Sequence, residues 1–379
     1  MGPSAGRLIG RVIGVGRRLL PRHGRGMLGR VEGRRLGDRR SALAIRVLGI
    51  LASLAALWLV LRSVDVGASI ELLSRANPLP LVCVLGILTT QVLLRAFRWP
   101  LLLPATPAGA TVRVRRVVPV LLVGYLGNAV LPMRLGEPIR AILVARREDL
   151  DAPESFGSVV LERVIDTATL AIVAFIASVA VGAPAWIVRG TGVAAVGGGV
   201  LTAALVVVGV GPLVGAVRRL ARPLPGATRT EPILSRLGDF ARGVDRPSRS
   251  RVMLVAVIIS WACWMLDALT FSLVAASLGV SINPMAALLI AAVAVLGTAL
   301  PSAPGYVGTF ELAAATTAQT LGVAAAPALA LAVLAHLLMV VPVAVAGALS
   351  LVAMDVNLGR LARDATRAGE VRDLAVVEP

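Results

Sequence analysis

The stretch VVPVLLVGYLGNAVLPMRLGEPIRAILVA, residues Val117–Ala145, is an apolar run interrupted in its middle by LPMRLG at Leu131–Gly136. Proline removes a backbone donor and clashes with the preceding helical turn, while glycine permits the dihedral angles of a tight reversal. The pattern therefore predicts a helical hairpin, two short helices joined by a break. A second apolar run, Pro284–Gly322, is broken in the same way by LPSAPG at Leu300–Gly305. The alternative for either run is a single Pro-kinked spanning helix.

The whole chain is too apolar for a soluble fold. Of its 379 residues 57% are hydrophobic and 16% are charged, and the mean hydropathy is +0.85. Soluble domains are only about 45–50% apolar. We therefore expect an all-α polytopic membrane protein with about six spanning helices and two re-entrant helical hairpins. The runs that approach the roughly 20 residues of a membrane span are Ser41–Leu61, Pro78–Leu94, Val164–Val181, Thr191–Val217, Val252–Val280 and Ala324–Met354.

The distribution of arginine predicts the orientation. All 38 basic residues are Arg, and the formal net charge is +17. Because they lie in tails and loops, where Arg orients helices and meets anionic lipid, we expect no nucleic-acid partner. Arg95–Arg116 holds five Arg and no acid, and Arg218–Arg251 holds nine Arg against three acids, whereas the alternate loops hold two or fewer. The positive-inside rule then places both termini in the cytoplasm of a multi-pass plasma-membrane protein.

This threading makes the two hairpins enter the membrane from opposite sides, as in an inverted repeat. GNAVLPMRLGE at Gly127–Glu137 and GTALPSAPGYVGTFE at Gly297–Glu311 share a Gly, a Leu-Pro, a later Gly and a Glu. In inverted repeats with broken helices, the substrate site usually lies near the middle of the membrane. The predicted domains are a disordered basic cytoplasmic tail at 1–40, a transmembrane domain at 41–354 with halves at 41–182 and 191–354, and a charged cytoplasmic tail at 355–379.

Ionisable residues inside a membrane are costly, so each requires a function or a partner. In the functional interpretation the arginines bind a phosphate, while the carboxylates receive protons or a cationic part of a headgroup. In the structural alternative, Arg134 or Arg140 pairs with Glu162 or Asp166 and only holds hairpin to helix. The candidate residues are Arg134, Glu137, Arg140, Glu162, Arg163, Asp166 and Glu311, and the predicted breaks contain Pro132, Gly136, Pro301, Pro304 and Gly305.

Other residues give weaker indications. Asp267 is the lone charge in its span and is compatible with helix pairing, an interfacial position or a substrate role. His336 is expected to be a hydrogen-bonded packing residue rather than a metal ligand. Cys83 and Cys263 have no partner spacing, and we expect neither a disulfide nor a metal site. Since no nucleotide-binding, zinc or nucleophile motif occurs, the sequence predicts no catalytic residues and no cofactor.

Four motifs in order resemble the lysylphosphatidylglycerol synthase transmembrane, or flippase-like, family. They are RAFRWPLLL at Arg95–Leu103, GNAVLPMRLGEPIRAILVARR at Gly127–Arg147, SVVLERVIDTATL at Ser158–Leu170 and LPSAPGYVGTFELAAA at Leu300–Ala315. The resemblance implies importance for Asn128, Pro132, Arg134, Gly136, Glu137, Arg140, Glu162, Arg163, Asp166, Pro301, Pro304, Gly305, Gly308 and Glu311. The family includes the membrane half of the multiple-peptide-resistance factors, which moves aminoacylated phosphatidylglycerol between leaflets. Residues 355–379 leave no room for the soluble domain of those factors, so we expect no synthase activity and leave the lipid open.

The predicted function is translocation of a lipid or lipid-linked intermediate, whose headgroup passes an Arg and Glu cavity between the two hairpins. The alternative is a non-transporting membrane subunit that binds a lipid-linked intermediate and presents it to a separate glycosyltransferase. A third class, an intramembrane enzyme acting on lipid phosphates, would require a nucleophile or His-based motif. The expected partners are therefore membrane lipids, with a glycosyltransferase or a second copy of the chain as candidate protein partners.

Overall fold

The computed structural model of the chain describes residues 51, 53–59, 61–62, 64–131, 134–221, 227–248, 251–299 and 302–370. Throughout these ranges the regular structure is helical and contains no strand, which confirms the all-α fold class. Several predicted features lie outside the described residues. They are Pro132, Pro301, the basic tail at 1–40 and most of the first predicted span.

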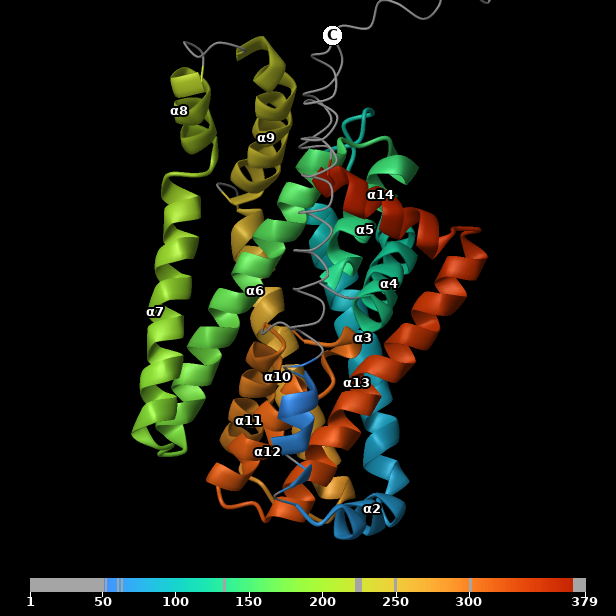
Figure 1. Cartoon of the computed structure of the whole chain (residues 1–379), viewed down its shortest axis with the longest axis vertical. Helices are drawn as coiled ribbons and strands as arrows, with labels where there is room; N and C mark the ends of the chain where they lie inside the picture. The colour runs from blue at the N-terminus through green and yellow to red at the C-terminus, as the bar shows by residue number, and fades with distance from the viewer. Residues whose placement is uncertain are drawn as a thin grey trace, which may run out of the picture. The chain divides into compact units, whose positions relative to one another are not determined.

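Four of the described helices are long and apolar enough to cross a membrane. They are α3 (Pro78–Leu102), α7 (Ala185–Val207), α10 (Val252–Ser277) and α13 (Ala325–Ala353). A further helix, α6 (Ala152–Ala180), has 29 residues but carries several charged side chains. Figure 1 shows α6 and α7 side by side, with α13 crossing in front of α3. The chain is thus a multi-pass membrane protein, while the count of six spans and two re-entrant hairpins stays a prediction.

Both predicted hairpins are broken where the sequence indicates. The first consists of α4 (Val114–Val130) and α5 (Gly136–Glu148). The second consists of α11 (Pro284–Gly297), the 3-10 helix η3 (Pro304–Tyr306) and α12 (Thr309–Thr320). The four arms have 17, 13, 14 and 12 residues. Each is shorter than the roughly 20 residues that span a bilayer, and this favours re-entrant hairpins over kinked spanning helices.

The close approach of the two arms explains the glycine at the start of α5. A Cβ atom on Gly136 would lie 1.8 Å from the backbone oxygen of Gly124 in α4. The Gly136 N–H donates to Oδ1 of Asn128 at 3.0 Å, so α4 supplies a partner for one of the otherwise unpaired N–H groups at the start of α5. In the second hairpin, Gly305 and Gly308 have φ values of 71° and 90°, which glycine adopts without a Cβ clash.

The predicted ends of two spans were wrong, because the helices continue through charged residues that were expected to end them. The run Pro78–Leu94 was expected to end before Arg95, but α3 continues to Leu102. Likewise, α6 begins at Ala152, so Glu162 lies well inside the helix rather than at its start. A helix can carry buried charges when neighbouring helices supply opposite charges, as described below. The Arg count for Arg95–Arg116 therefore includes arginines that do not lie in a loop.

The predicted span Thr191–Val217 corresponds to the candidate span α7, but its bounds were wrong. Helix α7 ends at Val207, and Gly209 follows with a φ of 79°. The remaining apolar residues belong to a separate helix, α8 (Gly211–Ala221). The Arg-rich segment after it, predicted as a loop, forms α9 (Ala227–Ser248). Two more short helices are α2 (Val66–Ser74) and α14 (Leu358–Glu370), and residues 53–59 are helical as well.

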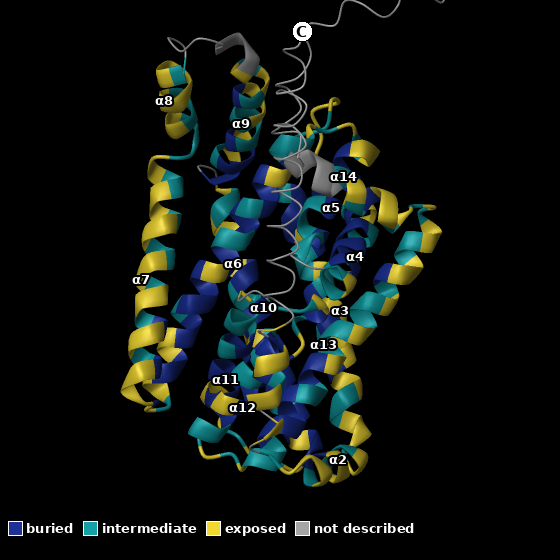
Figure 2. Cartoon of the chain, in the orientation of Figure 1, coloured by how far each residue is buried: buried dark blue, intermediate teal, exposed yellow. Residues whose placement is uncertain are grey.

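The helices differ in how much of their apolar surface is buried. Buried side chains from α3, α10, α11, α12 and α13 pack together, among them Val84, Phe271 and Leu331. In contrast, α7 buries only two residues within its length, and Figure 2 shows most of it as exposed. Val193 and Val196 on this helix are 75% and 68% exposed. An apolar surface of this kind indicates a helix that faces hydrocarbon rather than water.

We predict that Arg189, at the start of α7, and Arg242, in α9, lie on opposite sides of the membrane. Both side chains are exposed, and the 23 residues of α7 have a length of about 35 Å at about 1.5 Å per residue. A cysteine replacing Arg242 should react with an impermeant maleimide only from the cytoplasm, and one replacing Arg189 only from outside. The experiment requires a Cys83→Ser background, because Cys83 is exposed whereas Cys263 is buried. Labelling of both from one side would disprove the inverted-repeat topology.

Candidate functional site

Four buried charged residues join three helices inside the protein. Arg98 of α3 donates from Nη2 to Oε1 of Glu162 at 2.6 Å and from Nη1 to Oδ1 of Asp166 at 2.5 Å. Nη2 of Arg140 in α5 lies 2.8 Å from the other Glu162 oxygen. The side chains of Arg98 and Glu162 are 1% and 0% exposed. We call Arg98, Arg140, Glu162 and Asp166 the buried charge cluster, and it fastens α3 and α5 to α6.

Neighbouring polar groups extend the contacts of this cluster, whose two arginines and two carboxylates balance in charge. The hydroxyl of Ser260 in α10 donates to Oδ1 of Asp166 at 2.8 Å. Nη2 of Arg163 lies 3.1 Å from Oδ2 of Asp166. Nε of Arg163 lies 3.8 Å from Oε1 of Glu137 at the start of α5. Arg163 is partly exposed and so connects the buried charge cluster to the space beside it.

A cavity of about 470 Å³ lies beside the buried charge cluster, between the two hairpins. We call it the central cavity. Its lining contains both apolar residues, among them Leu88, Leu170 and Val340, and polar ones. Its polar lining comes from Gln91, Arg95, Tyr125, Asn128, Arg134, Glu137, Arg163, Asp166, Asp267, Thr298, Tyr306 and His336. A site that combines apolar walls with a few polar groups is typical of small-molecule and lipid binding.

The structure brings most of the predicted residues together, but in different roles. Asn128, Arg134, Glu137, Arg163 and Asp166 line the central cavity. The other residues predicted to bind substrate, Arg140, Glu162 and Glu311, are not part of its lining, whereas Gly305 of the second predicted break is. Arg140 and Glu162 lie behind it as an ion pair, and this agrees with the structural alternative for Arg140. Arg134, by contrast, makes no ion pair with a carboxylate within the described residues.

Arg134 instead connects the tips of the two hairpins. Its Nη2 donates to the backbone oxygen of Thr298 at 2.6 Å and to the Thr298 hydroxyl at 2.9 Å. Its guanidinium carbon lies 5.3 Å from the centre of the Tyr306 ring. Arg134 and Tyr306 have φ values of 53° and 62°. Such values are uncommon for residues with a side chain, cost energy and concentrate at functional sites.

Glu311 and His336 form a second buried polar pair. Nδ1 of His336 in α13 lies 2.5 Å from Oε1 of Glu311 in α12. The other Glu311 oxygen accepts from the Gly308 N–H at 2.7 Å, and the Phe310 ring stacks on the imidazole at 4.4 Å. His336 is therefore hydrogen-bonded, as expected. Glu311 is separated from the central cavity by His336 and Phe310, which line it.

Sequence reasoning missed or left open three residues of the cavity wall on α3 and α10. Asp267 accepts from Nε2 of Gln91 at 2.8 Å, and Nη2 of Arg95 lies 4.0 Å from its other oxygen. That oxygen, Oδ2, has no hydrogen-bond partner among the described residues. For Arg95 the sequence contained a signal in the pattern Arg95-Ala-Phe-Arg98. A spacing of three places both arginines on one face if the helix continues. The same pattern would have identified Arg98 of the buried charge cluster.

Metal binding has no structural basis within the part of the chain that is described. No three His, Cys, Asp or Glu side chains lie together there in a group able to hold a metal ion. The chemistry available in the central cavity is ionic and hydrogen-bonding, since its lining contains both guanidinium and carboxylate groups. Such groups bind and orient a charged headgroup.

Comparison with known proteins identifies related sequences. The family model described as "Lysylphosphatidylglycerol synthase TM region" matches residues 46–347. A protein named "Glycosyltransferase AglD", from Haloferax volcanii, is 28% identical over 360 residues. The match covers 86% of this chain but only 57% of that relative's length. No solved structure matches the chain significantly.

We predict that Arg98→Met destabilises the protein strongly, because it leaves Glu162 and Asp166 buried without their main partner. Breaking a buried pair by removing one partner costs about 3–5 kcal/mol. The matched control is Arg75→Met, since Arg75 forms an ion pair with Glu71 at the surface, where the two side chains are 77% and 60% exposed. Such a pair contributes at most about 1 kcal/mol. Unfolding of both purified variants in detergent, followed by heat or denaturant, measures the difference, and equal losses would contradict the assignment.

Proposed function

The chain belongs to the lysylphosphatidylglycerol synthase transmembrane-region family, and from this premise we propose that it moves a lipid or lipid-linked intermediate between membrane leaflets. In this proposal the headgroup occupies the central cavity while the hydrocarbon tails remain in the surrounding lipid. The plasma membrane, with both termini in the cytoplasm, is the proposed location. The chain acts as a transporter and catalyses no covalent step.

One observation carries this proposal. The lining of the central cavity combines charged and apolar residues, and the cavity lies between two hairpins whose arms are shorter than a bilayer span. Charged groups at membrane depth are costly, and they usually mark a substrate or ion pathway. Broken helices in transporters commonly line the substrate site. An amphiphile has both a charged and an apolar part and would match such a lining.

The arrangement of charge favours a headgroup that contains a phosphate. Arg95, Arg134 and Arg163 supply guanidinium groups, which suit the geometry of phosphate oxygens. Asp267 offers an acceptor that no described residue fills. A hydroxyl or amine of the same headgroup would donate to it. The cavity is thus suited to a phosphodiester that also carries a hydrogen-bond donor, as sugar-linked and amine-bearing lipids do.

Arg134 is well placed to act as a gate between the hairpins. Only one of its terminal nitrogens is used in the bonds to Thr298, so other donors remain for a phosphate. A phosphate that binds Arg134 more strongly than the Thr298 oxygens do would release the second hairpin. The two hairpins would then separate and open the cavity toward one leaflet.

A second candidate function is favoured by one comparison. The relative from Haloferax volcanii is named a glycosyltransferase, and this chain spans 57% of its length. The chain would then bind a lipid-linked intermediate in the same cavity without transporting it and present it to a glycosyltransferase. That enzyme, or a second copy of this chain, would be its protein partner.

We predict that Arg134→Ala and Glu137→Ala abolish transport without loss of folded protein. Both residues line the central cavity, and neither belongs to the buried charge cluster. The assay uses proteoliposomes of the purified chain that contain fluorescent phosphatidylglycerol or a fluorescent polyprenyl-phosphate sugar. Dithionite quenching from outside then measures movement between leaflets. The exposed Arg189 is the matched control, and Arg189→Ala should transport as the wild type does.

The outcomes separate the two candidate functions. Movement by the wild type that is lost in both cavity variants supports transport. Binding of the lipid without movement supports presentation to a partner enzyme. Loss of folded variant protein in detergent would instead assign Arg134 and Glu137 a structural role.

A further inference from the structure

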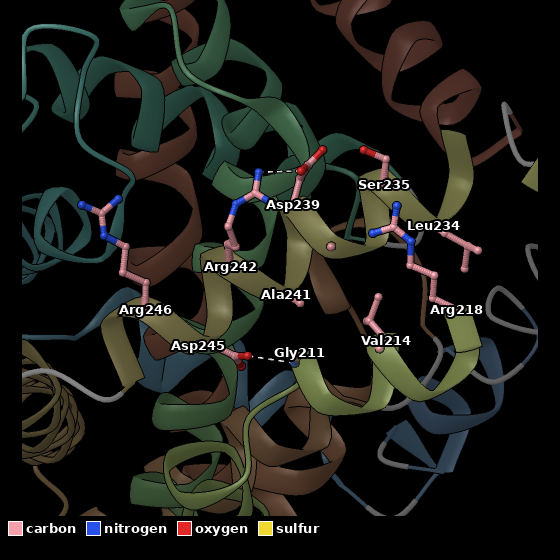
Figure 3. Close-up of a pocket in the computed structure, with 12 residues that line it drawn as sticks. Gly211, Val214, Arg218, Leu234, Ser235, Asp239, Ala241, Arg242, Asp245 and Arg246 are labelled. Atoms are coloured by element: carbon pink, nitrogen blue, oxygen red, sulfur yellow. Dashed lines mark hydrogen bonds and ion pairs between the residues drawn. The ribbon is translucent and has the colours of Figure 1, made fainter. Parts of the chain in front are cut away.

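The two hollows of the protein differ in whether their charge can change. A hollow of about 540 Å³ lies between α8 and α9, where Figure 3 shows Asp239 bonded to Arg242. Arg218 beside it forms an ion pair with Glu231. No histidine is among the described residues that line this hollow. The central cavity, in contrast, has His336 in its lining, and histidine is the side chain that gains or loses charge near neutral pH.

His336 can take up a proton at one defined nitrogen. The two oxygens of Glu311 each accept one bond, from the Gly308 N–H at 2.7 Å and from Nδ1 of His336 at 2.5 Å. Because an ionised carboxylate only accepts, Nδ1 carries the hydrogen of the neutral imidazole. Nε2 is then the nitrogen that gains a proton. Glu311 would be the counter-ion of the resulting imidazolium, and a buried cation requires such a partner.

The residues around His336 include no second group of this kind. Its helix, α13, packs against α2, α3, α4, α10 and α12. On α2, Glu71 pairs with Arg75 at the surface. The described titratable groups on the other helices and on the hairpin tips that contact His336 or line the same cavity are Glu311, Arg95, Tyr125, Asp267, Arg134 and Tyr306. None of these residue types changes charge near neutral pH as histidine does.

The central cavity and the charges behind it are balanced when His336 is neutral. Among the described residues, the lining has three arginines and three carboxylates, which are Arg95, Arg134, Arg163, Glu137, Asp166 and Asp267. Behind the lining are two more of each, Arg98, Arg140, Glu162 and Glu311. A phosphodiester therefore adds one negative charge without a counter-charge. A proton on His336 restores neutrality, and since net charge inside a membrane is costly, the two ligands favour each other's binding.

The proton and the phosphodiester also act on the same hairpin. Glu311 accepts from the N–H of Gly308, which lies between η3 and α12 of the second hairpin. Protonation of His336 strengthens its bond to Glu311, because a bond between two charged groups is stronger than one to a neutral donor. Arg134, the proposed phosphate ligand, contacts Tyr306 and bonds to Thr298 of this hairpin. Both ligands can therefore change how the second hairpin is held.

We propose that the chain moves the anionic headgroup together with one proton, which is bound at Nε2 of His336. This inference rests on the proposed transport and adds its coupling ion. The imidazole takes the proton from water on the side to which the cavity is open and releases it to water on the other side. The loaded site carries no added net charge. Movement of the lipid therefore responds to a pH gradient and not to the membrane potential.

The test imposes gradients on proteoliposomes of the purified full chain that contain fluorescent phosphatidylglycerol. Buffers set the pH on each side, and potassium with valinomycin sets the membrane potential. At zero potential, a gradient of one pH unit should shift the leaflet ratio of the lipid toward the alkaline side by up to about tenfold, the limit for one proton per lipid. A potential without a pH gradient should leave the ratio unchanged. Dithionite quenching measures the ratio, and protein-free vesicles give the background.

Two variants test the assigned residues. His336→Gln keeps an amide N–H for Glu311 but takes up no proton, and Glu311→Gln removes the counter-ion. Each should give a leaflet ratio near one under the same pH gradient. Glu71→Gln is the matched control, because the Glu71 side chain is 60% exposed on α2, and it should respond as the wild type does. Thermal unfolding in detergent verifies that each variant is folded.

The wild-type measurement alone can overturn the inference. Lipid movement that ignores the pH gradient and follows the potential would mean that the anion moves without a proton, and the proposed transport would stand. A full response to the pH gradient in both variants would assign the proton to another group. No movement in any gradient would overturn the transport and its coupling together.

Discussion

The pairing of Glu162 with Arg98 and Arg140 is the contact on which the rest of the structure depends. Glu162 is fully buried in α6, so its charge must be compensated by neighbouring helices. Arg98 from α3 and Arg140 from α5 provide this compensation, and thereby fix where the first hairpin meets α6. The central cavity then lies on the other side of Asp166 and Arg163, which belong to the same helix. Displacing α6 would alter the cavity and the first hairpin together.

The two hairpins resemble each other at the point where their helices are interrupted. Each break contains a residue other than glycine with a positive φ, Arg134 in one and Tyr306 in the other. These two residues contact each other, and Arg134 also bonds to Thr298. Among the described residues at the breaks, Arg134, Gly305 and Tyr306 line the central cavity. Irregular backbone is tolerated at membrane depth in such a place. The conformational strain at each tip is compensated by the contact between Arg134 and Tyr306.

The positions of the breaks could be predicted from the sequence, since proline and glycine act locally. The ends of the helices could not, because they depend on partners distant in the chain. Arg95 and Arg98 looked like the start of a loop, yet Glu162 and Asp166 make it favourable for α3 to continue past them. Two carboxylates one turn apart within an apolar run required a cationic partner, but the partners predicted for them were Arg134 and Arg140, and Arg98 was missed. The Arg-rich segment after α7 was predicted to be a loop from its charge alone. That prediction overlooked the apolar positions that pack α9 against α6 and α8.

The buried pairing of Arg98 also has a consequence for biogenesis. Arg98 precedes Glu162 by 64 residues and Asp166 by 68, so the ribosome completes α3 well before either carboxylate exists. During that interval only water, lipid headgroups or the translocon can solvate the guanidinium. Arg98 lies about one turn before the end of α3, so its side chain can reach the membrane interface until α6 has been inserted. The final depth of α3 in the bilayer is therefore reached only when α6 arrives, which makes membrane insertion of this chain a cooperative event rather than a helix-by-helix one.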